Sequence, residues 1–91
     1  MDKHVTIRVT GSVQGVYFRK STKEFADGIG LVGYVKNNMD GTVTAEACGT
    51  DEQLEKIISW CKSGPNKAHV DKIEYNITSK CNKHYKIFEF L

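Results

Sequence analysis

The segment at residues 11–19, written GSVQGVYFR, holds the residues best suited to bind an anion. Its two glycines, Gly11 and Gly15, free the backbone for dihedral angles that other residues disfavour. Successive N–H groups in such a loop can point into one concavity, and the positive end of a following helix adds to their attraction for a phosphate. Arg19 stands where the loop is expected to become a helix. Its planar guanidinium can grip two phosphoryl oxygens at once.

A second segment, at residues 30–37, ends in a side chain suited to hold a water molecule. The carboxamide of Asn37 presents an acceptor and two donors without ionising. A water aligned with a scissile P–O bond supplies most of what hydrolysis of an activated phosphate needs, because the transition state is loose and positioning outweighs covalent help. Taken alone, Asn37 is more typical of a turn, and a lone Arg19 of a solvated first helical turn.

Two periodicities identify the elements that would position these residues. Residues 4–10 alternate between apolar and polar types, as do residues 70–78, which is typical of strands with one buried face. Apolar residues recur at helical spacing within residues 18–29, and again within residues 54–61 behind a capping box that begins at Thr50. The patterns therefore predict two helices among several strands.

The order of these elements predicts an α+β fold, the ferredoxin-like α/β sandwich. It reads β-α-β-β-α-β with a short terminal strand, and two helices on one face of a mostly antiparallel sheet define this plan. The Asp40-Gly41 pair marks the hairpin between the second and third strands. We expect one domain over residues 1–91. The predicted strands are residues 4–10, 31–38, 42–48, 70–78 and 85–91.

The two candidate segments together resemble the signature of the acylphosphatase family, G-x-V-Q-G-V-x-F-R followed by G-[FYW]-V-x-N. The resemblance covers almost the whole chain, and includes residues 40–43 and the Gly64-Pro65 region. The one departure noticed is Tyr34, where many members carry Trp, an exchange of one aromatic ring for another. The residues that match are Gly11, Val13, Gln14, Gly15, Val16, Phe18, Arg19, Gly33, Tyr34, Val35 and Asn37.

This resemblance implies hydrolysis of the carboxyl-phosphate bond of small acyl phosphates without a metal or an organic cofactor. It implies that Arg19 binds the phosphoryl group and that Asn37 orients the attacking water. The substrate's own phosphate would take the proton, so no side chain is needed as a base. We expect Gln14 and Val16 to contribute their backbone rather than their side chains. The implied phosphate-binding loop is Gln14, Gly15, Val16, Tyr17, Phe18 and Arg19.

The cysteines and histidines carry no separate chemistry in this interpretation. Two of the cysteines could pair, but their count is odd, and in a cytosolic protein the simpler interpretation is three reduced thiols. No two of them have the spacing of metal ligands. A phosphocysteine mechanism needs a Cys six residues before the arginine, where Val13 stands. We expect the histidines at the surface or at strand ends. The residues concerned are Cys48, Cys61, Cys81, His4, His69 and His84.

Composition limits the partners. The 91 residues carry a net charge of +2, too small to indicate nucleic acid or membrane on its own, and 40% are hydrophobic, as in ordinary globular domains. The absence of an apolar signal or membrane-spanning stretch favours the cytoplasm. We therefore expect a cytoplasmic monomer that meets a small acyl phosphate, with inorganic phosphate as product and inhibitor.

Two other functional classes stay open at this point. A regulatory module could keep the anion cradle without turnover, but binding alone does not require Asn37. A nucleic-acid binder of the same fold would carry stacking aromatic residues on its central strands. The third predicted strand, residues 42–48, has none. The identity of the physiological acyl phosphate is not determined by the sequence.

Overall fold

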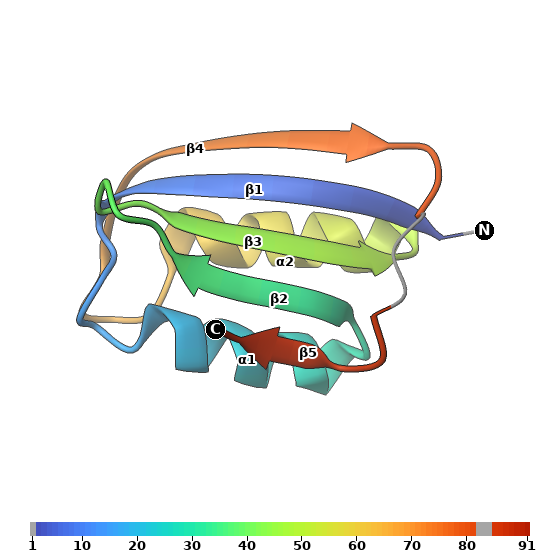
Figure 1. The fold of residues 1–91 in the computed structure, drawn as a ribbon, viewed down its shortest axis with the longest axis horizontal. Coiled ribbons are helices and arrows are strands. Elements are labelled where there is room, and N and C mark those ends of the chain that lie inside the picture. The colour runs from blue at the N-terminus through green and yellow to red at the C-terminus, as the bar shows by residue number, and fades with distance from the viewer. Residues whose placement is uncertain (1, 82–84) are drawn as a thin grey trace.

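The computed structural model describes residues 2–81 and 85–91. It contains a five-stranded sheet with both helices on one face (Figure 1). The sheet order is β4-β1-β3-β2-β5, in which β2 and β5 pair in parallel and the other neighbours are antiparallel, so the predicted ferredoxin-like fold is confirmed. The elements are β1 (Lys3–Ser12), α1 (Phe18–Ile29), β2 (Val32–Asn37), β3 (Val43–Gly49), α2 (Asp51–Ser63), β4 (His69–Thr78) and β5 (Phe88–Phe90). Neither helix is long and apolar enough to cross a membrane, within the part of the chain that is described.

β1 extends into the segment predicted as a loop and ends at Ser12. The extension forms because Gly11 and Ser12 pair with Val70 and His69 of β4, after a register shift that follows Thr10. Gly11 has a φ of 137°, and a Cβ at this position would lie 2.2 Å from the carbonyl oxygen of His69. Only glycine allows the two backbones to approach this closely. This contact fixes the point at which the chain leaves the sheet for the following loop.

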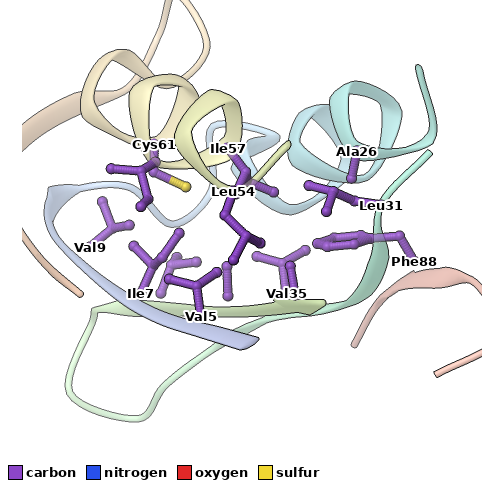
Figure 2. Close-up of a cluster of buried hydrophobic side chains, with 14 of the residues drawn as sticks. Val5, Ile7, Val9, Ala26, Leu31, Val35, Leu54, Ile57, Cys61 and Phe88 are labelled. Carbon is purple, nitrogen blue, oxygen red and sulfur yellow. The ribbon is translucent and has the colours of Figure 1, made fainter. Parts of the chain in front are cut away.

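The hydrophobic core lies between the sheet and the two helices (Figure 2). Val5, Ile7 and Val9 alternate along β1 and are fully buried, as predicted. Burying each such aliphatic side chain contributes roughly 1.5–3 kcal/mol. The core also takes in Phe18, the first residue of α1, and Phe88 of β5. Buried contacts thus hold in place the start of α1 and the C-terminal strand, the two elements that border the candidate site.

The alternation of β4 predicted a strand correctly but not a buried face. Ile73, Tyr75 and Ile77 lie opposite the buried residues of β1, yet Tyr75 is 52% exposed and Ile77 42%. β4 is an edge strand, and although Val70 and Ile73 pack against the core, Tyr75 and Ile77 farther along it are left partly uncovered. Periodicity identifies which side chains share a face, whereas the helix positions decide whether that face is covered.

A half-buried carboxylate organises the face of the sheet opposite the helices. Glu46 of β3 lies with its Oε1 2.9 Å from Nε2 of His4, and its Oε2 accepts a hydrogen bond from Tyr34. Tyr85 donates to Oε1 over 3.4 Å, which attaches the segment before β5 to the sheet. Burial tends to raise the pKa of Glu46, but the hydrogen bonds from Tyr34 and His4 outweigh it and hold this pKa below its usual range. Burial, together with Glu46, raises the pKa of Tyr85 to about 12.

His4 lies near the start of β1, as expected of a strand-end residue, but it is half-buried and its Nε2 contacts Glu46. His69 is exposed at the start of β4, as expected, with Nε2 3.0 Å from Asp71. His84 lies outside the described residues. The pattern of β1 placed His4 on its polar face, but only the pairing of β1 with β3 brings Glu46 beside it.

The interpretation of three reduced thiols is also wrong, because Cys48 and Cys81 form a disulfide. Cys48 is buried on β3, and Cys81 follows β4 with its N–H donating to the carbonyl oxygen of Asp2. Their separation of 33 residues in the sequence gave no local sign that they would meet. Cys61 is a free, fully buried thiol of α2, and burial raises its pKa to about 12. It stays protonated and unreactive at neutral pH.

We expect reduction of the Cys48–Cys81 bond to lower the free energy of unfolding by at most about 3–4 kcal/mol, because it releases a closed loop of 33 residues in the unfolded chain. Denaturant titrations with and without dithiothreitol measure the difference. Cys81→Ser should unfold like the reduced protein and should not respond to dithiothreitol. Titration of three thiols after the unreduced protein is denatured would contradict the disulfide.

Candidate active site

The loop between β1 and α1 leaves a row of backbone donors unpaired. Gly15 and Tyr17 have positive φ angles of 75° and 60°, and these turn the chain sharply into α1. Within the described residues, the N–H groups of residues 15–20 donate to no other protein group, and the first bond of this turn runs from the N–H of Ser21 to the carbonyl of Tyr17 at 2.9 Å. Free donors at the positive end of a helix dipole favour an anion.

A cavity of about 420 Å³ lies against this loop. Its lining residues come from the loop, from the start of α1 and from the ends of β2 and β5. The structure thus brings Arg19 of α1 and Asn37 of β2 to one cavity. The predicted loop residues Gly15, Tyr17 and Phe18 line it too. The complete lining is Val13, Gly15, Tyr17, Phe18, Arg19, Lys20, Asn37 and Phe90.

The guanidinium of Arg19 is held by the C-terminal segment. Its Nη1 donates a hydrogen bond to the carbonyl oxygen of Leu91. Leu91 is itself fixed, because its N–H donates to the carbonyl oxygen of Val35 at 2.8 Å. A guanidinium carries five N–H donors, so this bond orients the group and leaves others for an anion. The residue that positions Arg19 therefore comes from the opposite end of the chain.

Asn37 is directed toward the helix layer by the pleat of β2. Side chains two residues apart share a face of a strand, and Val35 on that face is fully buried beneath the helices. Asn37 is half-buried, pairs through its strand with Val43, and lines the cavity. Among the described residues its carboxamide forms no hydrogen bond to another protein group. It is free to bind a ligand or water.

The side chain of Gln14 forms hydrogen bonds, contrary to the expectation that this residue contributes only its backbone. Its side-chain Nε2 donates to the carbonyl oxygen of Asn38 at 2.8 Å and to that of Thr42 at 3.0 Å. These carbonyls belong to the turn that follows Asn37, so the side chain ties the loop to the other half of the site. Val16 is half-buried against the core, which fits the architectural role expected of it.

Asp40 stabilises the same turn from within. Its Oδ1 accepts hydrogen bonds from the hydroxyl of Thr42 at 2.6 Å and from the backbone N–H of Thr42 at 3.0 Å. Those bonds hold the pKa of the Asp40 carboxyl below its usual value, with Arg8 nearby adding to the effect. The turn that Gln14 contacts is therefore also held by hydrogen bonds of its own.

We expect Gln14→Glu, which keeps the shape but replaces the donor by a carboxylate, to weaken inhibition by inorganic phosphate about tenfold. Facing two carbonyl oxygens, the carboxylate would be repelled, and the lost hydrogen bonds together are worth roughly 1–3 kcal/mol. Phosphate inhibition constants and denaturant titrations measure the two effects. Gln14→Ala should show a smaller loss, and equal affinities in all three proteins would contradict the anchoring role.

The sequence analysis did not single out three groups at the cavity: Lys20, Phe90 and the carbonyl of Leu91. Lys20 follows Arg19 in the first helical turn, so its position was a signal that could have been used. The sequence held no comparable signal for Phe90 and Leu91, because their position at the cavity depends on β5 pairing in parallel with β2. The parallel pairing carries the end of the chain past α1 to the loop.

The fold and the cavity define a class of protein: a ferredoxin-like α/β sandwich with a loop of unpaired backbone N–H groups ahead of its first helix. The family model described as Acylphosphatase matches residues 5–90. An acylphosphatase of Lactobacillus gasseri is 45% identical over 82 residues, 89% of this chain and 90% of that protein. One of Thiobacillus denitrificans is 40% identical over 76 residues, 84% and 85% of the two chains. The crystal structure of acylphosphatase from Bacillus subtilis superposes with a TM-score of 0.91 at 31% identity, covering 98% of both chains. This chain belongs to the acylphosphatase family.

Proposed function

We propose that this acylphosphatase uses the cavity beside α1 to hydrolyse the carboxyl-phosphate bond of small acyl phosphates, R–CO–O–PO₃²⁻, to a carboxylate and inorganic phosphate. One observation carries the assignment of the site: the unpaired amides of residues 15–20 adjoin Arg19 and Asn37 at a single cavity. A phosphoryl group needs several donors and a positive charge, and hydrolysis also needs a placed water. The unpaired amides would supply the donors, Arg19 the positive charge, and the Asn37 carboxamide would place the water.

In this proposal the phosphoryl group lies on the amides of residues 15–19, with the guanidinium of Arg19 on its oxygens. The donors are fixed before binding, since the Leu91 carbonyl orients Arg19 and the Gln14 side chain anchors the loop. Preorganised donors cost no reorganisation as charge shifts during the reaction, which makes electrostatic stabilisation effective. Binding and charge stabilisation are thus supplied by the same groups.

Asn37 would hold the attacking water in line with the bond that breaks. The water oxygen forms a bond to phosphorus, and the bond from phosphorus to the acyl oxygen breaks. The carboxylate departs as a stable anion and needs no acid. The water proton passes to a phosphoryl oxygen of the substrate. In keeping with that, the described residues that line the cavity include no Asp, Glu or His to act as a base.

A module that binds the anion without turnover is the second candidate. Asn37 favours the enzyme, because an anion-binding module has no use for an unpaired carboxamide beside its donors. We also propose that the protein acts as a cytoplasmic monomer on small molecules, with no nucleic-acid or membrane partner. Gel filtration with light scattering should give the mass of one chain.

A spectrophotometric assay with benzoyl phosphate tests the function directly. We expect saturable hydrolysis, competitive inhibition by inorganic phosphate and no loss of rate with EDTA, since the proposed residues need no metal. Failure to hydrolyse the substrate while phosphate still binds would favour the binding module. Inhibition by EDTA that added metal reverses would contradict the mechanism.

A further inference from the structure

Tyr17 occupies a backbone conformation that its residue type disfavours. Its φ and ψ are 60° and 25°, in the left-handed region, and within the described residues it is the only non-glycine residue with a positive φ. Glycine or asparagine would adopt this conformation more readily. Such residues persist where function requires them and cluster at binding sites. The conformation of Tyr17 therefore raises the question of what its side chain does.

Folding does not account for the ring. The side chain of Tyr17 is 72% exposed, and among the described residues it forms no hydrogen bond to another group. Phe90 of β5 presents a second ring that is 47% exposed. Both residues line the cavity, although they come from opposite ends of the chain. Two solvent-facing aromatic rings at one cavity contribute little to the core and offer an apolar surface to a ligand.

The position of the phosphoryl group decides where the rest of a substrate lies. With that group on the loop amides and Arg19, the acyl group must extend from the cavity toward solvent. Val13 and Phe18 belong to the buried core, whereas Tyr17 and Phe90 are the exposed apolar residues of the lining. The acyl group therefore leaves the cavity along these two rings.

We propose that Tyr17 and Phe90 form an acyl-group subsite that selects acyl phosphates with a flat aromatic or bulky apolar acyl group over acetyl phosphate. This inference rests on the proposed function and adds a substrate class to it. The ring of Tyr17 determines specificity, whereas its backbone N–H belongs to the phosphate cradle. A side-chain substitution that keeps the backbone conformation separates the two roles.

The test compares benzoyl phosphate with acetyl phosphate in the wild-type protein, Tyr17→Asn and Tyr17→Phe. Asparagine accepts the left-handed conformation but lacks the ring, and phenylalanine keeps the ring. We expect Tyr17→Asn to lower the ratio of kcat/KM for benzoyl phosphate to that for acetyl phosphate about fivefold to tenfold, mainly through KM, as expected for an aromatic contact. Tyr17→Phe should keep the wild-type ratio. Tyr17→Gly provides the same comparison if Tyr17→Asn folds poorly.

A binding measurement separates this subsite from the proposed function. Calorimetry with benzoylmethylphosphonate and acetylmethylphosphonate, in which CH₂ replaces the bridging oxygen, should show the same loss of preference in Tyr17→Asn. A wild-type enzyme that hydrolyses both substrates, with a ratio unchanged in Tyr17→Asn, would overturn the subsite and leave the function standing. Equal losses for both substrates would overturn it too, because they indicate loop distortion. A wild-type protein that hydrolyses neither would overturn both.

Discussion

Arg19→Gln should lower kcat/KM for benzoyl phosphate by about 10³–10⁵, and should remove inhibition by inorganic phosphate at millimolar concentrations. Glutamine keeps two donors but loses the positive charge and the planar fork that meets two oxygens. The side chain belongs to no core cluster, and the one hydrogen bond that it forms among the described residues, to Leu91, is exposed. Steady-state kinetics with phosphate as competitor measures both losses, and circular dichroism verifies the fold.

Arg8→Gln is the matched control, because Arg8 is the other arginine of the chain. It lies on β1, away from the cavity lining, and pairs with Asp40 in a half-exposed contact. Such surface ion pairs are worth about 0–1 kcal/mol, so this variant should keep nearly full activity. Near-full activity in Arg19→Gln, or an equal loss in both variants, would contradict the role of Arg19.

Asn37→Ala should lower kcat for benzoyl phosphate by about 10²–10³, the usual effect of removing one preorganised group, while phosphate inhibition stays within about twofold. The reason is that Asn37 holds the water rather than the phosphoryl group. The carboxamide has no protein partner in the described structure, so its removal breaks no internal bond. Measuring kcat and the phosphate inhibition constant in both proteins shows whether the substitution affects turnover without affecting phosphate binding.

Asn76→Ala provides the control for this experiment. Asn76 is an exposed residue of β4 and is remote from the cavity lining. It should keep wild-type kinetics. If Asn37→Ala lost phosphate binding and rate in parallel, Asn37 would instead shape the loop, and the proposed role in orienting water would be wrong.

The sequence predicted the features that depend on neighbouring residues. The alternation of β1, the spacing within α1 and the Thr50–Gln53 capping box are local, and all three are present in the structure. The loop at residues 11–19 could be proposed as an anion site for the same reason: glycines, a helix start and an arginine are adjacent in the chain. The end of β1 was misjudged, because its last residues pair with β4.

The features that the sequence did not predict depend on contacts between distant segments. Cys48 meets Cys81 only because β4 pairs antiparallel with β1 and ends beside the end of β3 that carries Cys48. Leu91 reaches Arg19 only because β5 pairs with β2. The side chain of Gln14 has two acceptors only once the β2–β3 turn lies beside it. Each contact arises from the folded topology and leaves no mark in the local spacing of residues.

The most direct test is a phosphate titration of ¹⁵N-labelled protein followed by NMR. The account predicts saturable shifts concentrated in the amides of residues 15–20 and in the side-chain NεH of Arg19, with a dissociation constant equal to the kinetic inhibition constant of phosphate. Shifts centred elsewhere on the molecule, or saturation that leaves these amides unmoved, would contradict the claim that this loop and Arg19 form the phosphoryl site.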